Sequence, residues 1–108
     1  MNNLEIKSYL LKQFKSRIRD SDELDARIKR FTLDYLRSFN DLKSELKRIY
    51  STNDSQGLNV YYRDNEDELV EIENDNDMQH AFNQNTLVNK VYITLKQNEI
   101  VAAQVKKN

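Results

Sequence analysis

The side chains best suited to chemistry are carboxylates, and they are concentrated in one stretch of the chain. Eight of them fall within the fourteen residues 64–77. The spacing Asp64-x-Glu66-x-Glu68 is similar to the start of a calcium-binding loop. Such a loop needs glycine at its sixth position, between two helices, whereas the sixth residue here is Leu69. Calcium binding is therefore not expected. Two interpretations remain: a solvated charged turn, or a surface that binds a basic partner.

The hypothesis of a docking surface depends on which acids lie on the same side of the molecule. A strand, a turn, a second strand and a short helix would hold five carboxylates on one side of the molecule. These candidate interface residues are Asp64, Glu66, Glu68, Asp75 and Asp77. One exposed ion pair contributes only about 0–1 kcal/mol. Several pre-positioned pairs, above all with an arginine fork on a carboxylate, provide orientation and affinity together.

The basic side chains that could complement these acids lie in two strands predicted near the N-terminus. They are Lys7, Lys29 and Arg30. Adjacent residues of a strand point to opposite faces, so Lys7 shares a face with only one of the other two. Ordinary surface exposure accounts for these residues about equally well. A second basic cluster is interpreted as solvated surface, and its members are Lys15, Arg17 and Arg19.

Catalysis has little support in the sequence. His80 is the only histidine, and it has no cysteine partner and no serine in a nucleophile setting, so we interpret it as a helix surface residue. The carboxylates lie in an exposed turn, whereas general acids need a pocket that shifts their pKa. The absence of cysteine excludes disulfides and cysteine-ligated zinc. We therefore expect a protein that is not an enzyme and that holds no metal or cofactor.

The overall composition indicates one domain with a small core and an ionic surface. Of the 108 residues, 38% are hydrophobic and 32% charged, and the net charge is −1. Residues 1–50 hold 12 basic and 8 acidic side chains, whereas residues 51–95 hold 2 and 9. The low net charge argues against a general affinity for nucleic acid or for an anionic membrane, and no apolar stretch is long enough for a transmembrane span. The uneven layout favours an electrostatically oriented binding module.

Hydrophobic periodicity predicts an α+β fold. Strands are expected at 4–11, 28–33, 58–62, 69–72 and 91–95, with helices at 41–51 and 76–83. The long connection 12–27 is expected to be an extended loop with a helical turn near 22–26. Ser38 and Asn40 are candidate caps of the first helix, and Asp75 of the second. This order predicts a mixed sheet of four or five strands, with one main helix across it and the first and last strands parallel at its centre.

Several of these segments resemble one family of interaction domains. The segment Tyr62–Val70, followed by Asp75–Met78, resembles the acidic signature of a PB1 domain. The segments Ile6–Leu11 and Ile28–Phe31 resemble the basic elements of that family. Together they look closest to the N-terminal PB1 domain of sequestosome-type selective-autophagy receptors. The resemblance places the domain at 3–96, leaving 97–108 as a C-terminal tail or linker.

The resemblance implies a ubiquitin-like β-grasp fold and front-to-back association, in which the acidic face of one copy binds the basic face of the next. Lys7, Lys29 and Arg30 match the family's basic positions, and the five acids above match its acidic ones. It therefore implies homo-oligomers or filaments of a cytoplasmic scaffold in selective autophagy or signalling, with autophagic bodies or condensates as sites of accumulation. The alternative is pairing through one face only with a different PB1 protein, such as a kinase.

Two positions in the acidic turn depart from the family pattern. Asn65 replaces a usual acid, and Asp67 stands where the family usually has glycine. The connection 12–27 has no clear family pattern. We therefore expect the turn to be the part of the interface that differs most from its relatives.

Overall fold

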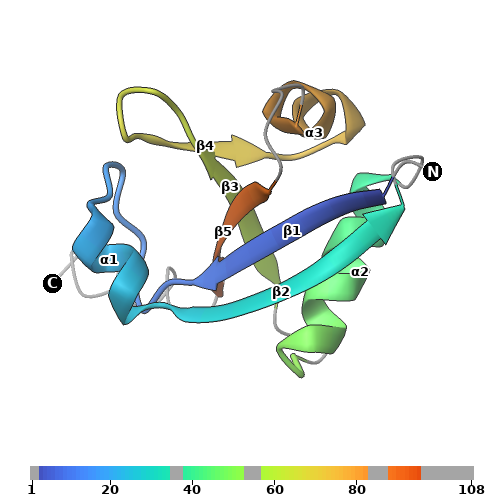
Figure 1. Ribbon diagram of the computed structural model, residues 1–108, viewed down its shortest axis with the longest axis horizontal. Coiled ribbons are helices and arrows are strands. Elements are labelled where there is room, and N and C mark those ends of the chain that lie inside the picture. The colour runs from blue at the N-terminus through green and yellow to red at the C-terminus, as the bar shows by residue number, and fades with distance from the viewer. Residues whose placement is uncertain (1–2, 35–37, 53–56, 83–87, 96–108) are drawn as a thin grey trace, which may run out of the picture.

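A computed structural model of the chain describes residues 3–34, 38–52, 57–82 and 88–95 (Figure 1). The predicted tail 97–108 lies outside this part. The helices and strands are, in chain order, β1 (Asn3–Leu10), α1 (Asp20–Asp25), β2 (Arg27–Asp34), α2 (Phe39–Ile49), β3 (Leu58–Arg63), β4 (Leu69–Ile72), α3 (Asp75–Phe82) and β5 (Asn89–Leu95). Among the described helices, none has the length and apolar character needed to cross a membrane.

The five strands form one mixed sheet in the order β2-β1-β5-β3-β4. β1 and β5 run parallel, with Ser8 opposite Val91, and the other neighbours are antiparallel. The predicted parallel pairing of the first and last strands is confirmed, and β5 lies at the centre. The five predicted strands are all present, although β5 begins at Asn89 rather than at residue 91.

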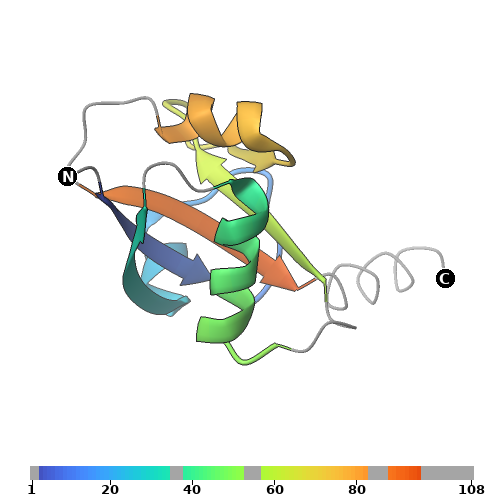
Figure 2. The same ribbon diagram turned by 90° about the vertical axis from the view of Figure 1, so that its right-hand side faces the viewer.

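Helix α2 packs across one face of this sheet, as predicted (Figure 2). Its residues Leu42 and Leu46 are fully buried. The Ser38 hydroxyl accepts a hydrogen bond from the Asp41 amide at 3.2 Å, and the Asp41 carboxylate accepts one from the Ser38 amide at 3.0 Å. This reciprocal capping box confirms Ser38 as the cap, whereas Asn40 lies inside the helix. Opposite α2, the sheet contributes the buried residues Ile6, Val60, Ile72, Val91 and Ile93.

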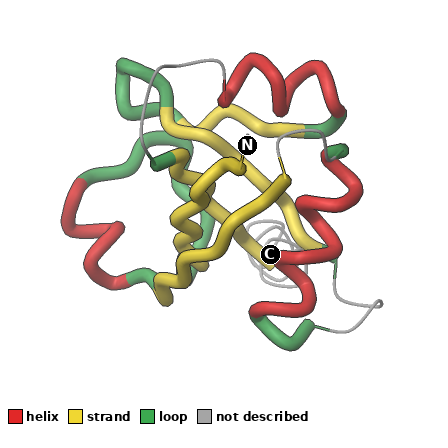
Figure 3. Tube along the Cα trace, turned by 45° about the vertical axis from the view of Figure 1, so that its right-hand side comes forward, coloured by secondary structure: helices red, strands yellow, loops and turns green. Residues whose placement is uncertain are grey.

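The opposite face of the sheet carries a second, smaller core that was not predicted. Tyr9 and Tyr92 stack there with their ring centroids 4.9 Å apart, and Ile18 packs with them. All three are at most 2% exposed. The alternating pattern correctly placed Tyr9 on the face of Lys7, but this face is not simply solvated. Figure 3 shows the reason: α1 and its flanking loops lie on the side of the sheet away from α2.

The connection between β1 and β2 is therefore a docked segment rather than an extended loop. Its helix spans Asp20–Asp25, slightly before the turn predicted near 22–26. Before that helix, the Ile18 amide donates to the Asp67 carbonyl at 2.9 Å, and the Leu69 amide donates to the Ser16 carbonyl at 2.8 Å. These backbone bonds attach the connection to the turn between β3 and β4.

Helix α3 is capped by Asn74 rather than by the predicted Asp75. The Asn74 side-chain oxygen accepts a hydrogen bond from the Asp77 amide at 2.9 Å, while Asp75 is already the first helical residue. The Asp75 carboxylate instead accepts from the Phe39 amide at 2.7 Å, which joins the start of α3 to the start of α2. The inward-facing residues are, as predicted, Met78, Ala81 and Phe82.

Candidate functional site

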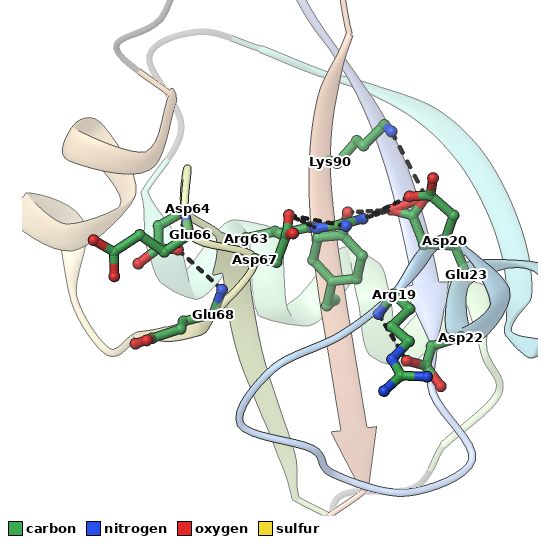
Figure 4. A network of polar contacts seen from close by, with 11 residues as sticks. Arg19, Asp20, Asp22, Glu23, Arg63, Asp64, Glu66, Asp67, Glu68 and Lys90 are labelled. Carbon is green, nitrogen blue, oxygen red and sulfur yellow. Dashed lines mark hydrogen bonds and ion pairs between the residues drawn. The ribbon is translucent and has the colours of Figure 1, made fainter.

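The acidic turn at 64–68 joins β3 to β4 and is folded around one of its own carboxylates (Figure 4). Asp64 Oδ1 accepts hydrogen bonds from the amides of Glu66 and Glu68, both at 2.9 Å. The Asp64 amide also donates to the Glu68 carbonyl at 2.9 Å. Asp64 is therefore half-buried and structural in part, whereas the Glu66 side chain is exposed. The Glu68 side chain is 47% exposed and lies 3.2 Å from an Arg17 nitrogen.

Asp67 occupies the turn position where the family pattern has glycine, and its backbone explains that preference. Its φ is 64°, in the left-handed region that glycine enters most easily. Its carboxylate oxygen lies 3.0 Å from both Nε and an Nη of Arg63. The aspartate therefore combines an unfavourable backbone conformation with an ion pair that glycine could not form.

The two remaining acids lie at the start of α3, at the other end of β4. Asp75 bonds the Phe39 amide as described, and Asp77 Oδ2 accepts from the Glu73 amide at 3.0 Å. Between α3 and the strands β3 and β4 lies a surface groove lined by Tyr62 and Met78, with Asp77 also on its wall. The predicted acids thus lie at the two ends of β4, and three of the five also hold local structure.

The basic residues form a row that crosses the sheet perpendicular to its strands. Lys7 on β1 lies directly opposite Arg30 on β2 and directly opposite Lys90 on β5. The ammonium groups of Lys7 and Lys90 lie 5.4 Å and 5.9 Å from the centroid of the Tyr9 ring. Arg30 lies 3.3 Å from a Glu5 carboxylate oxygen, with its side chain 55% exposed. The three cations therefore lie beside one another on three neighbouring strands.

Lys29 does not join this row, because it points to the other face of the sheet. Its ammonium donates to the Ile49 carbonyl at 2.9 Å and lies 5.5 Å from the centroid of the Tyr50 ring. A lysine at the C-terminus of a helix also complements the helix dipole. The structure therefore places Lys29 at the end of α2. Because adjacent residues of a strand point to opposite faces, Lys29 and Arg30 cannot both belong to the basic row.

An ion-pair network links the basic row to the acidic turn. Arg63 Nη1 lies 3.1 Å from Glu23 and 3.3 Å from Asp20, both in α1, in addition to its pair with Asp67. The Tyr92 hydroxyl donates to Glu23 at 2.6 Å. Burial first, and the Glu23 carboxylate second, raise the pKa of the Tyr92 phenol well above its ordinary value. Figure 4 shows these groups converging from α1, β3 and the turn.

Three residues of this arrangement were missed at the level of sequence. Lys90 has a usable signal, because parallel pairing of the first and last strands places it beside Lys7, but the predicted strand began at residue 91 and so left Lys90 out. Arg63 lies in the acidic segment Tyr62–Val70, yet two of its partners, Asp20 and Glu23, come from α1. Glu23 carries no signal of its own, since nothing in the sequence indicates that its helix docks on the sheet.

The described residues offer little for metal binding or catalysis. They contain no group of three or more histidine, cysteine, aspartate or glutamate side chains arranged to hold a metal ion. His80 is exposed on α3, as predicted, with its ring centroid 6.3 Å from that of Tyr62. What the geometry provides is acids at the two ends of β4 and a row of three cations across β2, β1 and β5.

A five-stranded mixed sheet with α2 across one face is the ubiquitin-like β-grasp fold. The profile of the PB1 domain matches residues 13–102, and the chain belongs to this family of protein-interaction domains. The expected fold and family are thus confirmed. The interface roles of the individual acids and bases, and the domain limits 3–96, stay predictions.

Solved structures of the same fold support this assignment. The AtNBR1 PB1 domain has a TM-score of 0.61 and 16% identity, covering 88% of this chain and 99% of the other. A cryo-EM structure of the AtNBR1 PB1 filament (L-type) has a TM-score of 0.59 and 17% identity, covering 88% and 97%. No curated protein sequence matches the chain.

Proposed function

We propose that this domain is a non-enzymatic interaction module that associates front to back with copies of itself. In this assembly the acids along the β3–β4 hairpin of one copy bind the basic row of the next. The observation that carries the proposal is that one chain presents both sets: Glu66 and Glu68 at the turn, and Arg30, Lys7 and Lys90 in register across three strands.

Such an interface is heterologous, because the two surfaces that meet are different. A heterologous contact forms a ring if the rotation closes and a filament if it does not. The AtNBR1 PB1 domain, which shares the fold, forms a filament. Neighbouring strands are spaced by about 4.8 Å, so the basic row offers a regular series of cations to several carboxylates at once. We extend the proposal to the biological role that the sequence resemblance implies, a cytoplasmic scaffold in selective autophagy or signalling.

The test uses variants that each lack one surface. Lys7→Ala/Arg30→Ala removes two cations of the basic row, and Glu66→Ala/Glu68→Ala removes two acids of the turn. Glu66 and Glu68 are chosen over Asp64 because the Asp64 carboxylate folds the turn. We expect wild type to give assemblies in light scattering that shrink in high salt, each variant to be monomeric, and an equimolar mixture to give dimers only.

The control variant Lys12→Ala/Lys47→Ala removes two cations that lie outside the basic row, and it should assemble as wild type does. A wild-type domain that stays monomeric at high concentration and low salt would exclude self-association. If such a monomer binds another PB1 protein and one of the two surface variants does not, the competing function of one-face pairing, for example with a kinase, replaces the proposal. Assembly that survives in both variants would show that other surfaces are used.

A further inference from the structure

The basic row is longer than the part of it that faces solvent. On β3, the antiparallel pairing of Tyr61 with Tyr92 places Arg63 opposite Lys90, two residues further along. Arg63 therefore continues the series of Arg30, Lys7 and Lys90 across a fourth strand. Four cations on four adjacent strands would repel one another strongly if all were left unneutralised.

A carboxylate from the same chain already occupies the inner half of this row. Glu23, in α1, lies 3.1 Å from an Arg63 nitrogen and 3.8 Å from Lys90 Nζ, and its side chain is only 13% exposed. It also accepts the Tyr92 hydroxyl hydrogen bond at 2.6 Å. Glu23 thus sits among the cations in the way that an acid of a bound partner would.

The outer half of the row is different. Arg30 is 55% exposed on its side chain, and its ion pair with Glu5 joins two groups that are each about half exposed. Lys7 lies over the Tyr9 ring rather than against a buried carboxylate. The Lys90 side chain is itself 49% exposed, but the carboxylate 3.8 Å from it belongs to Glu23, which is 13% exposed and is also held by Arg63 and Tyr92. The carboxylate beside Arg30 belongs to Glu5, which is 45% exposed, so an incoming acid can replace Glu5 at Arg30 more easily than it can replace Glu23 at Lys90.

We propose that Glu23 is an internal competitor that restricts the basic surface to its Lys7–Arg30 end and so determines which acidic partners fit. The partner is a carboxylate-bearing turn of a second copy, so this inference rests on the proposed function. With Glu23 in place, Lys90 adds little to binding and Glu23 repels a further incoming carboxylate. The connection 12–27 thereby sets the usable length of the binding surface.

The experiment measures the binding affinity between two variants that each lack one surface, so that they form a one-to-one complex and no longer assembly. The acid donor is the K7A/R30A variant, and the receiver is the E66A/E68A variant, with or without Glu23→Gln. Glutamine keeps the size of the side chain and an oxygen for the Tyr92 hydroxyl. We expect E23Q to tighten binding about two- to fivefold at low salt, corresponding to one exposed or partly exposed charge pair gained, and to lose that gain in high salt.

Asp25→Asn in the receiver is the matched control, because it makes the same change of charge on the same helix. It should change the affinity by less than about twofold, as surface charges away from the contact contribute little. Lys90→Gln completes the cycle: it should have little effect with Glu23 present and should cancel the gain in the E23Q background. Affinity is measured by calorimetry, with melting curves to verify folding.

Two results would overturn the inference. One is an E23Q receiver that binds no more tightly than the D25N receiver while remaining folded. The other is a loss of fivefold or more from Lys90→Gln alone, which would show that Lys90 already contacts the partner. The second measurement stays decisive even if E23Q does not fold. Absence of binding between the unmodified donor and receiver would instead refute the proposed function itself.

Discussion

Replacing Asp67 separates two opposing effects that the structure assigns to this one residue. Its left-handed backbone, with φ of 64°, costs a non-glycine residue about 1–2 kcal/mol, with aspartate at the lower end. Its carboxylate holds two nitrogens of Arg63 at 3.0 Å, and the Arg63 side chain is only 18% exposed. A charge-assisted pair of this kind, with one partner largely buried, stabilises by about 1 kcal/mol.

Three substitutions should therefore rank in a fixed order of unfolding free energy. Asp67→Asn tolerates the left-handed backbone but loses the ionic partner, which should lower stability by about 1 kcal/mol. Asp67→Ala loses the pair and also suits the backbone poorly, for a total of about 2 kcal/mol. Asp67→Gly loses the pair but relieves the backbone, so it should fall within about 0.5 kcal/mol of wild type.

The assay is thermal or urea unfolding in the K7A/R30A background, so that association does not add to the measured stability. For a domain of this size, 1 kcal/mol corresponds to about 4–8 °C in Tm. Repeating the series in 1 M salt should shrink the loss in Asp67→Asn, whereas the difference between alanine and glycine should persist because it arises from the backbone. Equal stability of the alanine and glycine variants would refute the strained-turn reasoning, and an unaffected asparagine variant would refute the role of the ion pair.

Two further outcomes follow from contacts described above. Lys29→Ala should lower the free energy of unfolding by about 1 kcal/mol, because it removes the hydrogen bond to the Ile49 carbonyl. Arg30→Ala removes only an exposed ion pair and should lower it by less than about 0.5 kcal/mol. Urea unfolding measures both variants, and the reverse order of stability would contradict this assignment. Since the pKa of the Tyr92 phenol is raised in the folded domain, the unfolded chain releases that proton first, and stability falls as pH rises above the ordinary tyrosine value near 10. The gap in Tm between wild type and Tyr92→Phe should accordingly narrow from pH 8 to pH 11, and a constant gap would contradict the assignment.

The sequence predicted the elements well wherever one periodic pattern dominated. Strands with regular alternation, such as β1, and the capped helix α2 were correctly placed, because local backbone preference and burial agree there. Lys29 and Arg30 were correctly expected on opposite faces for the same reason. The prediction for α3 was less accurate, since Asn74 and Asp75 are both good capping residues and local sequence does not separate them.

The second core and the network around Arg63 could not be predicted in this way. Both depend on where the connection 12–27 docks, and its apolar residues have no period that would indicate a buried face. Ile18 is buried, whereas Leu24, only six residues later, is 83% exposed. Contacts such as Glu23 with Arg63 join residues forty positions apart, so they appear only once the sheet and the docked segment are placed together.

The position of β2 at the edge of the described sheet has a consequence for strand-to-strand aggregation. In the described sheet β2 has a strand neighbour on one side only, and such an edge is a template for uncontrolled pairing with another chain. Three of its first four residues are the cations Arg27, Lys29 and Arg30, so two such edges would repel each other. At the opposite edge, the Arg17–Glu68 bridge covers the start of β4. Both edges of the described sheet therefore disfavour irreversible strand-to-strand aggregation with another chain.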